Sequence, residues 1–142
     1  MFLGTHEPKL DEKGRFFLPA KFREQLTDGL VVTRSQDRCL AIYPEQTFRE
    51  MAQKMASGPS TVKGVRDFQR MLAAGASSEV PDKQGRLSIP PALRAYAGLG
   101  KDIVVVGAID RIEIWDREAW ETYSAEQESV FAQMNHEVVP GE

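Results

Sequence analysis

Two short apolar runs, each followed at once by a proline, recur along the chain. Residues 15–18 and 86–89 have the length and the apolar content of short strands. Pro19 and Pro90 come next, and proline is favoured at the start of a helix because its missing N–H has no intrahelical partner there. The pattern therefore predicts, twice, a short strand that leads directly into a short helix.

Each predicted helix is followed by two strand-length apolar runs that an Asp-Arg turn separates. In the first half these runs lie at 30–33 and 39–43, and in the second half they lie at 103–108 and 112–115. Apolar runs joined by short polar turns are typical of antiparallel hairpins. We therefore expect one β-hairpin after each short helix.

Helical spacing appears between the two halves and towards the end of the chain. Pro44 and Asp116 stand where longer helices would begin, as a first-turn proline and an N-cap aspartate. Apolar residues recur at helical spacing from Phe48 to Met55, a Ser-Gly-Pro-Ser break follows, and a second helix is expected to stop at Gly75. We expect a helical hairpin between the halves and a helix after the second one.

The two halves read as copies of one unit. Segments 11–23 and 82–94, laid over each other with an offset of 71 residues, share three apolar positions and five identical residues. The identical pairs are Asp11/Asp82, Gly14/Gly85, Arg15/Arg86, Pro19/Pro90 and Arg23/Arg94. A unit of roughly 45 residues cannot bury much apolar surface alone, so we expect both copies to share one core.

These patterns together predict an α+β fold, a pseudo-twofold barrel of two β-turn-β-α-β-β modules with added helices. We place the first module at 1–50, a helical insert at 51–75, the second module at 76–123, and an acidic helix and tail at 124–142. The two modules are expected to form one compact core.

Charge is unevenly distributed along the chain. The net charge is −3, but residues 1–112 hold 17 basic and 13 acidic residues, whereas residues 113–142 hold one basic and eight acidic residues. A basic body beside an acidic end suits a polyanionic partner, and it equally suits a solvated acidic helix without a function of its own.

Several classes of function lack their sequence signatures. No run approaches the ~20 apolar residues that a membrane helix needs, and the first residues have no signal-peptide pattern. A lone cysteine, Cys39, excludes an internal disulfide and a CxxC metal site. Phosphate-binding, dinucleotide-binding and zinc-protease motifs are absent from the sequence. We expect a cytoplasmic protein that is not an enzyme and needs no cofactor or metal.

The repeated motif Asp-x-x-Gly-Arg-apolar-x-apolar-Pro, with a further apolar residue and arginine after it, resembles the swapped-hairpin barrel of AbrB-like transcription factors. Two copies in register, separated by a helical insert, resemble the MraZ family over nearly the whole chain. The resemblance implies a transcriptional regulator that binds short direct repeats in double-stranded DNA, at the promoter of a division and cell-wall gene cluster that includes its own gene. It also implies a ring-like homo-oligomer, expected to be an octamer, associated with the nucleoid.

The resemblance implies that Arg15 and Arg86 contact the duplex. Arginine can bind phosphate oxygens or the O6 and N7 atoms of guanine with two parallel hydrogen bonds. We assign phosphate contact to Lys13, Lys83 and Lys21, and support of the two turns to Asp11, Gly14, Asp82 and Gly85. An alternative from the residues alone is that each Asp–Arg couple is an ion pair that only holds its turn. Arg23 and Arg94 could contact phosphate, pack internally or pack against a neighbouring subunit.

A second functional class stays open. Related AbrB-like folds serve as antitoxins, whose extra segment holds a protein partner, and the helical insert could do this here. The duplicated unit argues against such a role, because antitoxins of this class are usually single-module chains.

Overall fold

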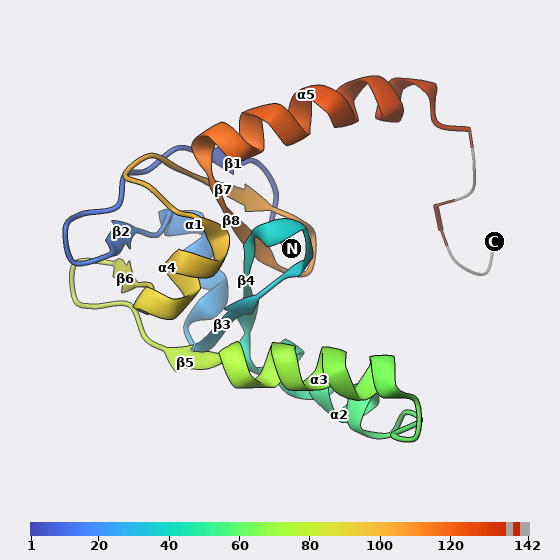
Figure 1. Cartoon of the computed structure of the whole chain (residues 1–142). Coiled ribbons are helices and arrows are strands. Elements are labelled where there is room, and N and C mark those ends of the chain that lie inside the picture. Colours follow the sequence, from blue (N-terminus) through green and yellow to red (C-terminus); the bar gives the residue numbers. More distant parts are fainter. Residues whose placement is uncertain (136–137, 140–142) are drawn as a thin grey trace.

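The computed structural model describes residues 1–135 and 138–139, and its strands form one six-stranded antiparallel sheet and a separate two-stranded ribbon (Figure 1). The first half contains β1 (Thr5–His6), β2 (Arg15–Phe17), α1 (Ala20–Arg23), a 3₁₀ turn (Glu24–Leu26), β3 (Leu30–Arg34) and β4 (Leu40–Pro44). The second half contains β5 (Ser77–Glu79), β6 (Arg86–Ser88), α4 (Pro91–Ala97), β7 (Ile103–Gly107) and β8 (Ile112–Asp116). The predicted strands and short helices are thus confirmed to within about two residues of their expected bounds.

The two halves exchange their first strands. The sheet order is β1-β7-β8-β4-β3-β5, so β1 of the first half pairs with β7 of the second, and β5 of the second half pairs with β3 of the first. At the centre of the sheet β4 pairs with β8, with Ile42 opposite Ile112 and Leu40 opposite Ile114. Each half therefore completes the sheet of the other.

The expectation of a barrel is wrong. β1 and β5 are the two edges of the large sheet and do not pair with each other, and β2 and β6 pair only with each other. Closure of a sheet needs its two edge strands to pair with each other, and here they do not. The broader prediction of an α+β fold is confirmed.

The main core lies between one face of the sheet and the layer formed by the ribbon, α1 and α4. Alternate residues of the four central strands face this core, and all are fully buried: Leu30, Val32, Leu40, Ile42, Ile103, Val105, Ile112 and Ile114. From the opposite layer Phe16, Phe22, Leu87 and Leu93 pack onto them. Residues of both halves thus belong to one core cluster.

Longer helices cover parts of the other face of the sheet. The predicted helical hairpin is α2 (Glu45–Ala56) and α3 (Lys63–Gly75), next to β3 and β4. α5 (Arg117–Gln133) begins over β7 and β8, with Asp116 as the expected N-cap that accepts a hydrogen bond from the Ala119 N–H at 3.3 Å. Figure 1 shows the hairpin and α5 at opposite ends of the molecule.

Under the start of α5, Trp115, Trp120 and Tyr123 form a compact aromatic cluster. The second half of α5 leaves the body, and Phe131 is 78% exposed. Trp120 therefore packs inside the chain, whereas Phe131 does not. Of the tail residues that make this end acidic, Glu137 and Glu142 lie outside the described residues. Within the described part of the chain, no helix is long and apolar enough to cross a membrane.

Candidate nucleic-acid interface

Each Asp-x-x-Gly-Arg segment folds into a tight turn that its aspartate organises. In the first copy one carboxylate oxygen of Asp11 accepts the backbone N–H groups of Lys13 and Arg15, both at 2.9 Å. The other oxygen accepts the Nε–H of Arg15 at 2.7 Å. Gly14 closes the turn with φ of +76°, a conformation that costs L-residues with a side chain about 1–2 kcal/mol. The sequence places aspartate and glycine where this geometry needs them.

The second turn repeats the first atom by atom. Asp82 accepts the N–H groups of Gln84 and Arg86 at 2.9 Å and the Arg86 Nε–H at 2.8 Å, and Gly85 has φ of +84°. In both turns the largest influence on the pKa of the aspartate carboxyl group is the hydrogen bond that it accepts from the arginine backbone N–H. That bond holds the pKa of Asp11 and of Asp82 below the ordinary 3.8, so both carboxylates are charged at neutral pH.

The ion pairs leave the outer part of each guanidinium uncommitted. Each aspartate takes only the Nε–H, and no hydrogen bond from Nη1 or Nη2 of Arg15 or Arg86 is formed with any residue that the structure describes. The Asp–Arg couple therefore does hold the turn, as one reading of the sequence has it. It also fixes the orientation of a group that can still donate several hydrogen bonds.

The ribbon that follows the turns brings the two arginines together. β2 and β6 pair antiparallel with Phe16 opposite Leu87, and both of these side chains point into the core. Their neighbours point the other way, because successive residues of a strand face opposite sides. The outer face therefore carries Arg15 opposite Ser88 and, at the other end, Arg86 opposite Phe17.

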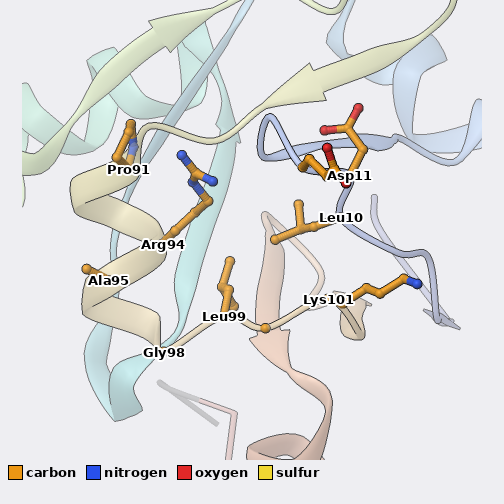
Figure 2. A pocket seen from close by; sticks show the side chains of 10 residues that line it. Leu10, Asp11, Pro91, Arg94, Ala95, Gly98, Leu99 and Lys101 are labelled. Atoms are coloured by element: carbon orange, nitrogen blue, oxygen red, sulfur yellow. The ribbon is translucent and has the colours of Figure 1, made fainter.

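Each half braces the turn of the other half with an arginine. Arg94 projects from α4 towards the segment that contains Asp11, beside a shallow groove (Figure 2). Its guanidinium lies flat against Gly14, where an added Cβ would stand 2.6 Å from the Arg94 Cζ and 2.8 Å from its Nε. The Arg94 Nε is buried without a hydrogen-bond partner among the described residues. The internal alternative for Arg94 is therefore the one that the structure supports.

Arg23 does the same for the second turn. A Cβ at Gly85 would overlap its guanidinium, with the Cζ 2.7 Å away. Two backbone hydrogen bonds also join the turn of one half to the other half. The Leu18 N–H donates to the Gly85 carbonyl at 3.0 Å, and the Ile89 N–H donates to the Gly14 carbonyl at 2.9 Å. The cross-bracing was not visible in the sequence, although the matched Arg23/Arg94 pair of the repeat was a signal for it.

The lysines predicted to contact phosphate occupy two kinds of place. Lys13 and Lys83 are exposed on the first and second turn, on either side of the ribbon. Lys21 lies on α1, where its Nζ is 5.9 Å from the ring centroid of Phe22 and close to Gly4. The structure thus brings Lys13 and Lys83 to the turns, whereas the observed contacts of Lys21 are with its own helix and the N-terminal segment.

Other potential sites are few. A cavity of about 390 Å³ lies between the α2–α3 hairpin and the sheet, lined among others by Met51, Met55, Phe68 and Met71. Cys39 is buried, and burial raises the pKa of its thiol to about 12. Among the residues at 1–135 and 138–139, no group of three or more His, Cys, Asp or Glu side chains is placed to hold a metal ion.

Known proteins resemble the chain over almost its full length. A family model described as "MraZ protein, putative antitoxin-like" matches twice, at residues 1–71 and 72–139. A "Transcriptional regulator MraZ" of Cutibacterium acnes is 70% identical over 134 residues, which is 94% of each chain. Proteins with the same name from Thermobifida fusca and from Leifsonia xyli subsp. xyli are each 57% identical over 141 residues, or 99% of each chain.

Proposed function

Because this chain belongs to the MraZ family, we propose that it regulates transcription by binding double-stranded DNA through the outer face of the β2–β6 ribbon. One observation carries the proposal. Arg15 and Arg86 lie on the outer face of one ribbon with 27% and 25% of their side chains exposed, each with its Nε held by an aspartate and with no hydrogen bond from its Nη atoms to any described residue. A two-stranded ribbon fits the major groove, where arginine binds guanine or phosphate with two hydrogen bonds.

The supporting groups have separate roles in this proposal. Lys13 and Lys83 neutralise phosphates beside the ribbon, and Lys21 neutralises a phosphate from α1. Such phosphate contacts raise the affinity for DNA but do not distinguish one base sequence from another. The net charge of −3 does not oppose this, because residues 1–112, which contain the ribbon, hold 17 basic and 13 acidic residues, whereas residues 113–142 hold one basic and eight acidic residues.

Fluorescence anisotropy with duplex from upstream of its own gene tests the proposal. Arg15→Ala and Arg86→Ala should each weaken binding about 5- to 150-fold and reduce the salt slope by about one, because each removes a charged contact. Arg38→Ala is the matched control, since Arg38 is an exposed arginine in the turn between β3 and β4, outside the ribbon and the α2–α3 hairpin. Equal, weak binding to native and scrambled DNA that neither ribbon variant changes would refute DNA recognition by this face.

The regulated sites in this proposal are short direct repeats in the promoter of a division and cell-wall gene cluster that contains the protein's own gene. A single ribbon makes few contacts, so one repeat is bound weakly. An oligomer that engages several repeats at once gains affinity through effective concentration. The protein therefore acts with the nucleoid in the cytoplasm, as a ring-like homo-oligomer, an octamer.

Two distant surfaces of one chain support such an assembly. The end of α5 exposes Val130 and Phe131 on a helix with one basic and four acidic residues, and α3 exposes Phe68 and Met71 on a hairpin with five basic and three acidic residues. These surfaces are complementary in charge and lie at opposite ends of the molecule. A head-to-tail contact between them would close into a ring if the rotation allows.

A mixing experiment tests the head-to-tail contact by light scattering. Phe131→Asp and Met71→Asp should each dissociate the oligomer, because each buries a charge in one side of the contact. Mixed together, the two variants should form a 1:1 pair and no more, since one intact surface of each remains. An oligomer that survives either substitution would show that other surfaces hold the subunits.

The α2–α3 hairpin is also the surface that the alternative, an antitoxin-like function, would use. Its exposed apolar residues and the cavity beneath them favour a protein partner of some kind. If the hairpin binds a foreign protein and not a second copy of this chain, Met71→Asp would leave both the oligomer mass and DNA binding as in the unaltered protein. The two functions are therefore separable with one variant.

A further inference from the structure

Phe17 is an exposed aromatic residue on the outer face of the ribbon, at the end of β2. It is 60% exposed, although its neighbours Phe16 and Leu18 are each 1% exposed. In the register of the ribbon it lies opposite Arg86. Residues two apart on one strand are about 7 Å apart, so Arg15 is its nearest neighbour on the same face along β2.

The fold does not require an aromatic side chain at this place. Ser88 occupies the equivalent position of the second copy, opposite Arg15, in the same backbone geometry. Phe17 forms no aromatic pair with any ring in the described part of the chain. An apolar ring that the fold leaves uncovered beside two arginines indicates a ligand surface that is partly apolar and otherwise rich in hydrogen-bond acceptors.

The edges of bases in the major groove of a DNA duplex have this combination. Guanine and phosphate accept hydrogen bonds from arginine, and the C5 methyl group of thymine is the apolar group that the groove exposes. We propose that Phe17 packs against a thymine methyl group next to the base or phosphate that Arg86 binds. This proposal rests on the function proposed above, and it assigns sequence discrimination to a residue next to both arginines.

The difference between Phe17 and Ser88 would also give the ribbon a direction. Arg15 and Arg86 are related by the pseudo-twofold axis of the ribbon, so the arginines alone would bind a site equally well in either orientation. With a thymine contact at one end only, one orientation is preferred. A site read in this way has no internal twofold symmetry.

Replacing thymines with deoxyuridine, one position at a time, tests the contact, because the change removes only the methyl group. The unaltered protein should bind about fourfold more weakly when one particular thymine is replaced, the effect of losing one buried methyl-sized group. Phe17→Ser, which copies the second half, should bind the thymine and uracil duplexes equally. Phe17→Leu should keep part of the discrimination, since leucine still offers an apolar surface.

Controls separate the possible outcomes. Ile109→Ser, which alters an equally exposed apolar residue away from the ribbon, should leave the thymine preference unchanged. A flat response of the unaltered protein to every uracil substitution would overturn the thymine contact while leaving DNA binding intact. A loss of oligomer mass in Phe17→Ser, with no thymine preference in the unaltered protein, would identify Phe17 as a subunit contact instead. Failure to distinguish native from scrambled DNA would instead refute the underlying function.

Discussion

Replacing Gly14 with alanine should destabilise the protein in two separable ways. The backbone at Gly14 has φ of +76°, and an alanine there costs about 1–2 kcal/mol. In addition, the new Cβ would stand 2.6 Å from Cζ and 2.7 Å from Nη1 of Arg94, so the guanidinium must leave its place. Only the second cost follows from the cross-bracing of the first turn by the second half.

The steric cost is at the low end of the range for overpacking, about 1 kcal/mol, because Arg94 can swing into the adjoining groove. The total loss for Gly14→Ala is then about 2–3 kcal/mol. In an Arg94→Ala background only the backbone cost of about 1–2 kcal/mol remains. The expected coupling between the two positions is therefore about 1 kcal/mol.

Urea denaturation, followed by tryptophan fluorescence at one fixed protein concentration, measures these differences. Gly98→Ala is the matched control, because Gly98 has φ of +61° and nothing lies within 4 Å of an added Cβ. It should show the backbone cost alone, with or without Arg94. If Gly14→Ala costs the same in both backgrounds, Arg94 does not brace the turn and the packing argument is wrong.

Three further predictions concern other parts of the molecule. Asp11→Asn should weaken DNA binding but keep the turn, because the amide oxygen still accepts the backbone N–H groups whereas the amide NH₂ cannot accept the Arg15 Nε–H. The pKa of Asp11 is lowered in the folded protein, so the stability that its carboxylate contributes is complete above pH 3.8 and is lost as the pH falls through the folded-state pKa. The urea midpoints of the variant and the unaltered protein should therefore converge below pH 3.8. Cys39, with its pKa raised to about 12, should react with a thiol reagent at pH 8 only as the protein unfolds, and rapid stoichiometric reaction of the folded protein would contradict its burial. Gly107→Ala should lower the free energy of unfolding by about 2 kcal/mol or more, because an added Cβ would collide with the backbone of Phe2 and Leu3, which cannot rotate away as a side chain can. The loss should appear as a lower Tm, and an unchanged Tm would show that the N-terminal segment is not held against Gly107.

The sequence carried enough information for the local structure of each half. Glycine in the turn, proline at the helix start and aspartate at the N-cap each act through neighbouring residues, so Gly14, Pro90 and Asp116 could be placed correctly from pattern alone. That Arg15 and Arg86 share one face of a two-stranded ribbon was not predicted, because it depends on the pairing of β2 with β6.

Long-range pairing was beyond the sequence. Thr5 of β1 lies opposite Val106, about a hundred residues away, and strands of two or three residues have no periodicity that reveals a partner. The exchange of β1 and β5, and the open sheet that results, depend on such pairs. Phe17 is a different case, because the buried positions at 16 and 18 imply by strand alternation that 17 faces outward.

The pairing of β2 with β6 has a consequence for how the protein responds to dilution. If each half were a separate chain, its ribbon strand would find its partner only by collision, and the fold would dissociate at low concentration. The α2–α3 connection turns that collision into an intramolecular step with a constant effective concentration. Covalent fusion also lets the halves differ at single positions, as at Phe17 and Ser88, which a dimer of identical chains could never do.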